Sequence, residues 1–325
     1  MSGHDPIDLR LMDEFQRDLP LVEHPFSAIA ETLCLTEAQV IDRLQRLQSL
    51  GAVARVGATV RPNTVGASTL AAMAVPPSRL STVAAQVGAE PGVNHSYQRE
   101  DDWNLWFVAT APDPAALASS LDRIRAATGL RVLDLRLVRA FNIDLGFRLT
   151  GAARPMTADR PPAQTPLTDS DRALLAALSK GLPLVPAPFA AIAGWLGTPE
   201  PALRARIAEL CAARIITRLG VIVRHRPLGW TSNAMVVWDL PVDRIEAAGR
   251  ALAAQPGVTL CYQRLSVPGA WPWTLYSMIH GRSRAEALAV LDAARTLPEL
   301  AGVACKPLFS TRCFKQTGAL IGEVA

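Results

Sequence analysis

The sequence predicts an α+β protein built as a tandem duplication, in which each copy has three short helices followed by strands and helices in the order β-α-β-β-α-β. Three observations predict this fold: an internal repeat, a composition that can fill a core, and helical spacing that gives way to strand-like segments within each copy. Of the 325 residues, 50% are hydrophobic and 19% are charged, which is typical of a folded globular protein. The length suits two domains or two similar halves.

The two copies of the internal repeat align without a gap over fifteen residues. Residues 19–33 read LPLVEHPFSAIAETL and residues 182–196 read LPLVPAPFAAIAGWL, so that ten of fifteen positions are identical. Further along, residues 97–99 and 262–264 both read Tyr-Gln-Arg. Residues 150–168, between the copies, are rich in Pro, Ala and Thr and lack an apolar period, which indicates a linker. We therefore expect the copies to pack side by side as a covalent pseudo-dimer.

The first part of each copy fits a winged helix-turn-helix. Apolar residues recur there at three- and four-residue steps, as expected of short amphipathic helices. Thr36 with Gln39 predicts a capping box at the third helix, and in copy two Thr198 predicts an N-cap with Pro199 at the first helical position. A strand-like pair, residues 53–59 and the equivalent 216–224, would form the wing.

The second part of each copy alternates strand and helix patterns in the ferredoxin-like order. In copy one we expect strands at residues 68–75, 93–99, 104–110 and 131–138, with helices at 78–87 and 114–127. In copy two we expect strands at residues 232–240, 258–264, 273–280 and 302–309, with helices at 243–254 and 284–296. The expected domains are 1–66 (helix-turn-helix, copy one), 67–149 (ferredoxin-like, copy one), 150–168 (linker), 169–229 (helix-turn-helix, copy two) and 230–325 (ferredoxin-like, copy two).

The composition of the chain argues against several classes of function. The 33 Lys+Arg and 29 Asp+Glu leave a formal charge of +4, which is small for a protein that neutralises many phosphates. No apolar run of about eighteen residues and no signal-like start is present, so we expect a cytoplasmic protein without a membrane span. The five cysteines form no CxxC pair, and we interpret them as buried structural thiols.

A helix-turn-helix followed by a ferredoxin-like module resembles the layout of Lrp/AsnC-type transcription regulators along nearly the whole chain. A regulator needs exposed basic or amide side chains on its recognition helix. In residues 37–49, Arg43 and Arg46 are offset by Glu37 and Asp42, so the candidate helix is nearly neutral. In copy two, Arg204 and Arg206 face Glu200 and Glu209. We therefore do not expect DNA binding.

More specific motifs resemble the sirohaem decarboxylase branch of this superfamily. These motifs are LPLxxxPFxxIA in both copies, HSYQR at 95–99 and WNLWF at 103–107, with the copy-two counterparts CYQR at 261–264, WPWTLY at 271–276 and RCFK at 312–315. In the pathway to the special haem of cytochrome cd nitrite reductase, D-type and L-type subunits of this family can occur as one fused chain, which the duplication resembles.

This resemblance implies an enzyme that removes carbon dioxide from two acetate side chains of sirohaem and gives didecarboxysirohaem. It implies a carboxy-lyase whose iron belongs to the substrate, with no separate cofactor and no protein-bound metal. Two other functions stay open: a DNA-binding regulator, and a non-catalytic sirohaem or haem carrier in which His95 or His225 is an axial iron ligand.

Decarboxylation leaves negative charge on carbon, so a proton donor with a pKa near neutrality suits the reaction. His95 alternates with Tyr97 and Arg99 on an expected strand, so these three side chains should share one face. Because Leu260 is the counterpart of His95, we expect this group once per chain, in one site between the halves. His225, in the tripeptide Arg-His-Arg at 224–226, is a second candidate, and the donor stays open among His95, Tyr97 and His225.

The eight carboxylates of sirohaem require cations, and the planar guanidinium of arginine pairs with carboxylate bidentately. Flat aromatic side chains could line the macrocycle. For His280 we expect a packing or loop role at a strand end. The expected substrate-binding residues are Arg55, Arg99, Trp106, Arg218, Tyr262, Arg264 and Lys315.

Overall fold

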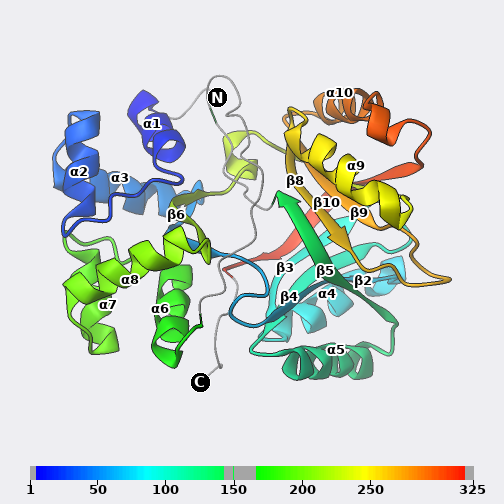
Figure 1. Ribbon diagram of the computed structural model, residues 1–325, viewed down its shortest axis with the longest axis horizontal. Helices are drawn as coiled ribbons and strands as arrows, with labels where there is room; N and C mark the ends of the chain where they lie inside the picture. The colour runs from blue at the N-terminus through cyan, green and yellow to red at the C-terminus, as the bar shows by residue number, and fades with distance from the viewer. Residues whose placement is uncertain (1–4, 143–148, 150–165, 319–325) are drawn as a thin grey trace. The chain divides into compact units, whose positions relative to one another are not determined.

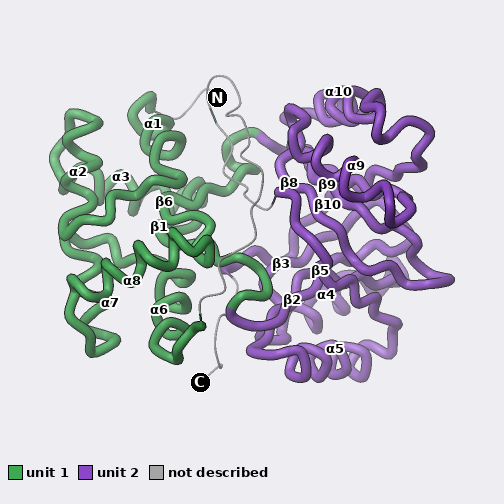
Figure 2. Tube along the Cα trace, in the orientation of Figure 1, with its two compact units in different colours: residues 1–64, 146–154, 161–229 green, residues 65–145, 155–160, 230–325 purple. Residues whose placement is uncertain are grey.

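The computed structural model describes residues 5–142, 149 and 166–318. The chain forms two compact units, coloured separately in Figure 2. Among the described residues, unit 1 holds 5–64, 149 and 166–229, and unit 2 holds 65–142 and 230–318. Each unit therefore combines corresponding segments from both copies of the repeat. Most of the expected linker, residues 150–165, lies outside the described residues.

Unit 1 contains three helices and one strand from each copy (Figure 1). Copy one supplies α1 (Pro6–Glu14), α2 (Pro25–Leu33), α3 (Glu37–Ser49) and β1 (Val53–Val60). Copy two supplies α6 (Asp169–Lys180), α7 (Pro188–Leu196), α8 (Glu200–Ala212), β6 (Ile216–Val223) and the short 3-10 helix η2 (Arg226–Leu228). No helix in the described part of the chain has the length and apolar character needed to cross a membrane.

One of the two expected helix caps in unit 1 is confirmed. Thr36 Oγ1 accepts a hydrogen bond from Gln39 N at 3.3 Å, and Gln39 Oε1 accepts one from Thr36 N at 2.9 Å. The expected cap at Thr198 is wrong, because Pro199 occupies the N-cap position and α8 begins at Glu200. Pro199 is the repeat counterpart of Thr36, so copy two has lost the side-chain cap at this point.

The two copies share a small sheet in unit 1. Strand β1 pairs antiparallel with β6, and Gly57 lies opposite Gly220. The expected wing strands therefore pair with each other across the copies. A Cβ atom at Gly57 would lie 2.5 Å from the carbonyl oxygen of Leu178, and one at Gly220 would lie 2.4 Å from that of Gln16. Glycine at these positions allows β1 to approach α6 of copy two, and β6 to approach the segment that follows α1 of copy one.

Unit 2 contains a β-α-β-β-α-β module from each copy, as the sequence predicts. Copy one supplies β2 (Ala67–Met73), η1 (Pro77–Arg79), α4 (Leu80–Ala89), β3 (Val93–Arg99), β4 (Leu105–Ala111), α5 (Pro114–Thr128) and β5 (Val132–Asn142). Copy two supplies β7 (Ser232–Trp238), α9 (Val242–Ala254), β8 (Val258–Arg264), β9 (Leu275–Gly281), α10 (Arg284–Arg295), η3 (Pro298–Leu300) and β10 (Cys305–Gln316).

The eight strands of unit 2 close into one barrel in the order β10-β3-β4-β2-β5-β8-β9-β7, with β10 pairing back onto β7. The last strand of each copy crosses into the sheet of the other copy. Strand β5 pairs with β2 as far as Arg136 and with β8 from Leu137. Strand β10 pairs with β7 as far as Phe309 and with β3 from Ser310. Both strands are longer than expected, because their crossing segments are partly exposed and lose the apolar alternation.

Three apolar clusters fill unit 2. One lies inside the barrel and includes Trp106, Leu135 and Met278. The other two lie on the outer faces, between the strands and the helices α4 and α5 in copy one, and α9 and α10 in copy two. Successive residues of each strand therefore point alternately to the barrel interior and to a helix layer.

Candidate active site

His95, Tyr97 and Arg99 lie along the inner face of β3, as the alternation predicts. In the β3–β4 register His95 and Tyr97 pair with Val108 and Trp106, which belong to the inner cluster. The rings of His95 and Tyr97 are 6.3 Å apart and 28° from parallel. The guanidinium carbon of Arg99 lies 5.8 Å from the centre of the Tyr97 ring. An imidazole, a phenol and a cation therefore share one face.

The equivalent face of β8 carries Leu260, Tyr262 and Arg264. Tyr262 stacks on Tyr276 at 5.8 Å, and the guanidinium carbon of Arg264 lies 4.6 Å from the Tyr262 ring. Burial lowers the pKa of Arg264 and raises that of Tyr276. This half keeps the phenol and the cation of copy one and replaces the imidazole of His95 by an aliphatic side chain.

Arg99 and Arg264 each reach the strand that crosses from the other copy. Arg99 Nη1 donates to the carbonyl oxygen of Leu308 at 2.9 Å, and Arg264 Nη1 donates to that of Leu135 at 2.8 Å. The bonded carbonyls precede the points at which β10 and β5 change partners. Each guanidinium therefore helps to hold the two sheets together. The Nε of Arg264 is buried and has no hydrogen-bond partner among the described residues.

Two of the expected substrate-binding residues, Trp106 and Lys315, make contacts that do not fit this role. Trp106 is 1% exposed and packs edge-on against Trp271 at 5.1 Å. It therefore supports Tyr97 from the core and offers no exposed wall to a macrocycle. Lys315 Nζ donates to the carbonyl oxygen of Gly88 at 2.7 Å, at the C-terminal end of α4. The helix α4 covers the outer face of the sheet, so this contact draws the Lys315 ammonium away from the inner face.

The remaining three expected residues belong to unit 1. Arg55 lies on β1, where its Nη2 donates to the carbonyl oxygen of Ala58 at 3.1 Å. Burial lowers the pKa of Arg55, and its Nε has no partner within the described parts of the chain. Arg218 lies on β6 and is 7% exposed, and His225 follows the same strand at the start of η2. The structure thus divides the expected site residues between the two units.

Sequence reasoning missed the inner-face position of His280. Tyr276 and Met278 of β9 belong to the inner cluster, so alternation also places His280 toward the barrel interior. His280 Nδ1 lies 2.8 Å from Thr259 Oγ1. Burial, with the positive charge of Arg99 adding to it, lowers the pKa of His280 to about 4. The period-two alternation of β9 could have predicted that His280 faces the interior. We instead expected a packing or loop role because His280 lies at the end of the strand.

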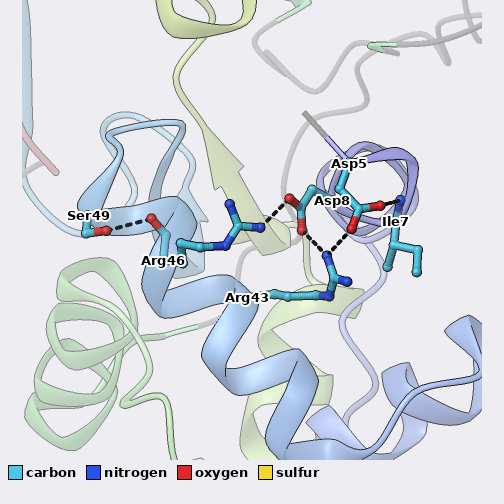
Figure 3. A network of polar contacts seen from close by, with 6 residues as sticks. All are labelled: Asp5, Ile7, Asp8, Arg43, Arg46 and Ser49. Carbon is cyan, nitrogen blue, oxygen red and sulfur yellow. Dashed lines mark hydrogen bonds and ion pairs between the residues drawn. The ribbon is translucent and has the colours of Figure 1, made fainter. Parts of the chain in front are cut away.

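The helix α3 would contact DNA in a regulator, but its arginines form ion pairs with carboxylates of their own three-helix domain (Figure 3). Arg43 Nη1 lies 2.8 Å from Asp5 Oδ2 and 2.8 Å from Asp8 Oδ1, and Arg46 also contacts Asp8. Asp8 is 1% exposed. In copy two, Arg206 contacts the equivalent Asp171. The arginines of α3 and α8 therefore stabilise the packing of the first helix in each copy.

Comparisons with known proteins agree with this architecture. A family model described as "AsnC-like ligand binding domain" matches residues 65–142 and 227–315, and one described as "Siroheme decarboxylase NirDL-like HTH domain" matches residues 8–53 and 171–216. The chain is 64% identical over 322 residues to the "Siroheme decarboxylase NirDL subunit" of Paracoccus pantotrophus, with 99% of each chain covered.

The fold of the chain is also similar to those of solved structures. A crystal structure of the siroheme decarboxylase NirDL matches with a TM-score of 0.70 and 28% identity, covering 98% of this chain and 94% of that one. Another, of NirDL in co-complex with an iron-uroporphyrin III analogue, matches with a TM-score of 0.68 and 27% identity, covering 97% and 93%. The shared length, the duplicated domains and the sequence identity lead to one conclusion: the chain belongs to the siroheme decarboxylase NirDL family.

Proposed function

We propose that the chain removes carbon dioxide from two acetate side chains of sirohaem and releases didecarboxysirohaem, in the synthesis of the special haem of cytochrome cd nitrite reductase. The family membership over the full length supports this reaction. The structural observation that carries the proposal is the group formed by His95, Tyr97 and Arg99 on the inner face of β3. This group combines a proton donor with a cation that can hold a carboxylate.

His95 is the proton donor in this proposal. Its imidazole titrates near neutral pH when unperturbed, so it can supply a proton without a large environmental shift. The contact between its Nδ1 and Asn94 Oδ1, at 2.6 Å, orients the ring. Tyr97 and His225 are the alternative donors, and variants at the three positions distinguish them.

Arginines hold the carboxylates that do not react. The buried Nε atoms of Arg55 and Arg264, which lack partners among the described residues, are N–H groups that a carboxylate could satisfy. Arg99 and Arg218 join them in the proposed set. The iron is part of the substrate in this proposal, consistent with the iron-uroporphyrin analogue bound in the solved relative. No further cofactor or protein-bound metal is proposed.

The proposed functional assembly is the pseudo-dimer within one chain. The barrel of unit 2 takes four strands from each copy, so one chain supplies both halves of the module. We propose that the chain acts in the cytoplasm and can assemble further as a homo-oligomer. DNA binding is not part of the proposed function.

The test is an anaerobic incubation of the purified chain with iron-loaded sirohaem, followed by mass analysis of the extracted tetrapyrrole. We expect loss of two carbon dioxide units per tetrapyrrole with multiple turnovers. Stoichiometric uptake of sirohaem without any loss of carbon dioxide, in folded protein, would support a carrier instead. Neither uptake nor turnover, together with tight DNA binding, would support a regulator.

A further inference from the structure

The loop that follows the tyrosine–arginine strand is twice as long in copy two as in copy one. Residues 100–104 join β3 to β4, whereas residues 265–274 join β8 to β9. The strands on either side correspond, because Tyr97 pairs with the second residue of β4 and Tyr262 pairs with the second residue of β9. The additional loop residues are therefore a specific feature of copy two, between strands that the repeat otherwise preserves.

The longer loop is a hydrogen-bonded hairpin. Pro268 and Gly269 are at the centre of its turn, with φ 71° at Gly269, and Ala270 N donates to the carbonyl oxygen of Val267 at 3.0 Å. Proline followed by glycine at positive φ is typical of a type II turn. Val267 and Trp271 then exchange two backbone hydrogen bonds of 2.8 Å. The loop thus has a defined conformation that holds Trp271 in place.

Trp271 inserts its side chain into the barrel. It is buried in the inner apolar cluster, against which Val267, Ala270 and Trp273 of the same loop also pack. Its Nε1 donates to the hydroxyl oxygen of Tyr276 at 2.7 Å. The loop of copy two therefore fills the barrel interior beside the start of β9.

The shorter loop of copy one makes different contacts. Glu100 Oε1 lies 2.8 Å from Arg284 Nη1, on the helix α10 that covers the outer face of the sheet. Asp101 forms an ion pair with Lys306 of β10. Trp103 packs against the inner cluster. This loop thus carries paired carboxylates and one tryptophan where copy two has an apolar hairpin.

The two equivalent inner faces differ in exposure as a result. Tyr97 is partly exposed, whereas its counterpart Tyr262 is buried. Leu260 lies on the same face as Tyr262 and packs against the inner cluster, at the position that His95 takes in copy one. The copy-two half of the barrel interior is therefore apolar and filled, and the copy-one half is polar and partly exposed.

We propose that the loop of residues 265–274, through Trp271, excludes the tetrapyrrole ring from the copy-two half of the barrel, so that the ring binds on the side of Tyr97. This inference rests on the proposed function. Two matched tyrosine–arginine strands would otherwise offer the ring two positions related by the pseudo-symmetry. Trp271 is then a specificity-determining residue that selects one of them. Arg264 keeps its proposed contact with a carboxylate, because a carboxylate arm needs less room than the ring.

A single position suits an asymmetric substrate. The acetate and propionate side chains are not arranged symmetrically around sirohaem, so a ring bound in the other half would present different groups to His95. Reaction requires that the reacting groups be held in a narrow range of geometries. Filling the copy-two half therefore avoids complexes in which the wrong side chain lies near the proton donor.

The test measures the binding of iron-uroporphyrin III by absorbance titration. It compares wild type with a loop variant in which residues 265–274 are replaced by the copy-one loop Glu-Asp-Asp-Trp-Asn, each with and without Tyr97→Ala. In wild type we expect Tyr97→Ala to raise the Kd about tenfold, because the ring loses an aromatic contact. In the loop variant the same substitution should raise the Kd less than about twofold, because the ring can bind beside Tyr262 instead.

A point variant and a control accompany the loop variant. Trp271→Ala opens the same space without rebuilding the loop, and it should reduce the effect of Tyr97→Ala in the same direction. Trp195→Ala is the matched control, because Trp195 is exposed on α7 of unit 1, and it should leave that effect unchanged. A general loss of stability would weaken binding with or without Tyr97 and would not remove the dependence on it. Should the loop variant not fold, Trp271→Ala decides by the same comparison.

The outcomes separate this inference from the proposed function. If wild type decarboxylates sirohaem and Tyr97→Ala weakens binding equally in every background, the inference is wrong and the proposed function stands. A wild-type Kd that does not respond to Tyr97→Ala would also overturn the inference. If wild type binds iron-uroporphyrin without decarboxylating sirohaem, the proposed function fails, and the loop comparison still decides where the ring binds. If wild type neither binds nor decarboxylates, both fail.

Discussion

Arg206 binds Asp171 through two parallel hydrogen bonds, from Nε to Oδ1 at 2.7 Å and from Nη2 to Oδ2 at 2.8 Å. This bidentate pair connects α8 to the first helix of copy two. Asp171 is 3% exposed and also accepts hydrogen bonds from Thr168, in the cap of its own helix. In a regulator an arginine of this helix would be directed at DNA, whereas here it holds the three-helix domain together.

We expect Asp171→Asn to lower the free energy of unfolding by about 1.5–3 kcal/mol, because hydrogen bonds to a charged group are lost and Arg206 keeps its charge. Urea unfolding at neutral pH measures the change. Asp169→Asn is the matched control, because Asp169 is on the same helix, fully exposed and 4.0 Å from Arg172. Its effect should stay within about 0.5 kcal/mol. Equal effects of the two substitutions would contradict the structural role of the buried pair.

The same pair predicts how stability depends on pH. The hydrogen bonds from Arg206, with those from Thr168, hold the pKa of Asp171 well below its ordinary value. The stabilisation is therefore complete above the unfolded pKa of about 4 and is lost as the pH falls toward the folded pKa. Unfolding measured from neutral pH down into this acidic range should show wild type and Asp171→Asn converging. A difference that stayed constant over this range would exclude Asp171 as its source.

DNA binding should be weak for a related reason. Arg43 and Arg206 are paired with buried carboxylates of the first helices, so these arginines are not available for phosphates or bases. Fluorescence anisotropy with a labelled random duplex, at physiological salt, should give a Kd no tighter than about 1 μM, the strong end of non-specific binding. Nanomolar binding that persists at higher salt would contradict this prediction.

Gly220→Ala should destabilise unit 1 by about 2 kcal/mol or more, because the added methyl group would meet the backbone oxygens of Phe15 and Gln16 at 2.4 Å. Gly194→Ala is the control, since nothing lies within 4 Å of the added Cβ in α7. In the middle of a helix that substitution should stabilise the protein by about 0.5–1 kcal/mol. Thermal unfolding of the two variants should therefore shift in opposite directions.

The modules of the fold could be predicted from the sequence because they depend on local patterns. The repeat revealed the duplication, and the period-two segments gave β3 and β8 with the bounds that the structure has. The crossing of β5 and β10 could not be found in this way. It depends on which strand of the other copy lies beside residues 137–142 and 310–316, and those partners are distant in sequence.

For the candidate site, too, the sequence could predict what depends on a single strand and could not predict what depends on contacts between distant residues. Alternation placed His95, Tyr97 and Arg99 on one face, since these residues follow one another on a single strand. It gave no measure of burial for Trp106, which turned out to lie in the core. The partner of His280 is Thr259, twenty-one residues away on another strand. No pattern along one strand could have paired them.

His95→Gln should abolish formation of the doubly decarboxylated product on the time scale of wild-type turnover, by a factor of about a hundred or more, because the substituted side chain cannot supply a proton. Binding of iron-uroporphyrin, followed by absorbance, should change little, since the cations that hold the carboxylates remain. His24→Gln is the control, because the His24 side chain is 51% exposed at the start of α2. Full turnover of His95→Gln together with loss of activity in His225→Gln would instead identify His225, after β6, as the donor.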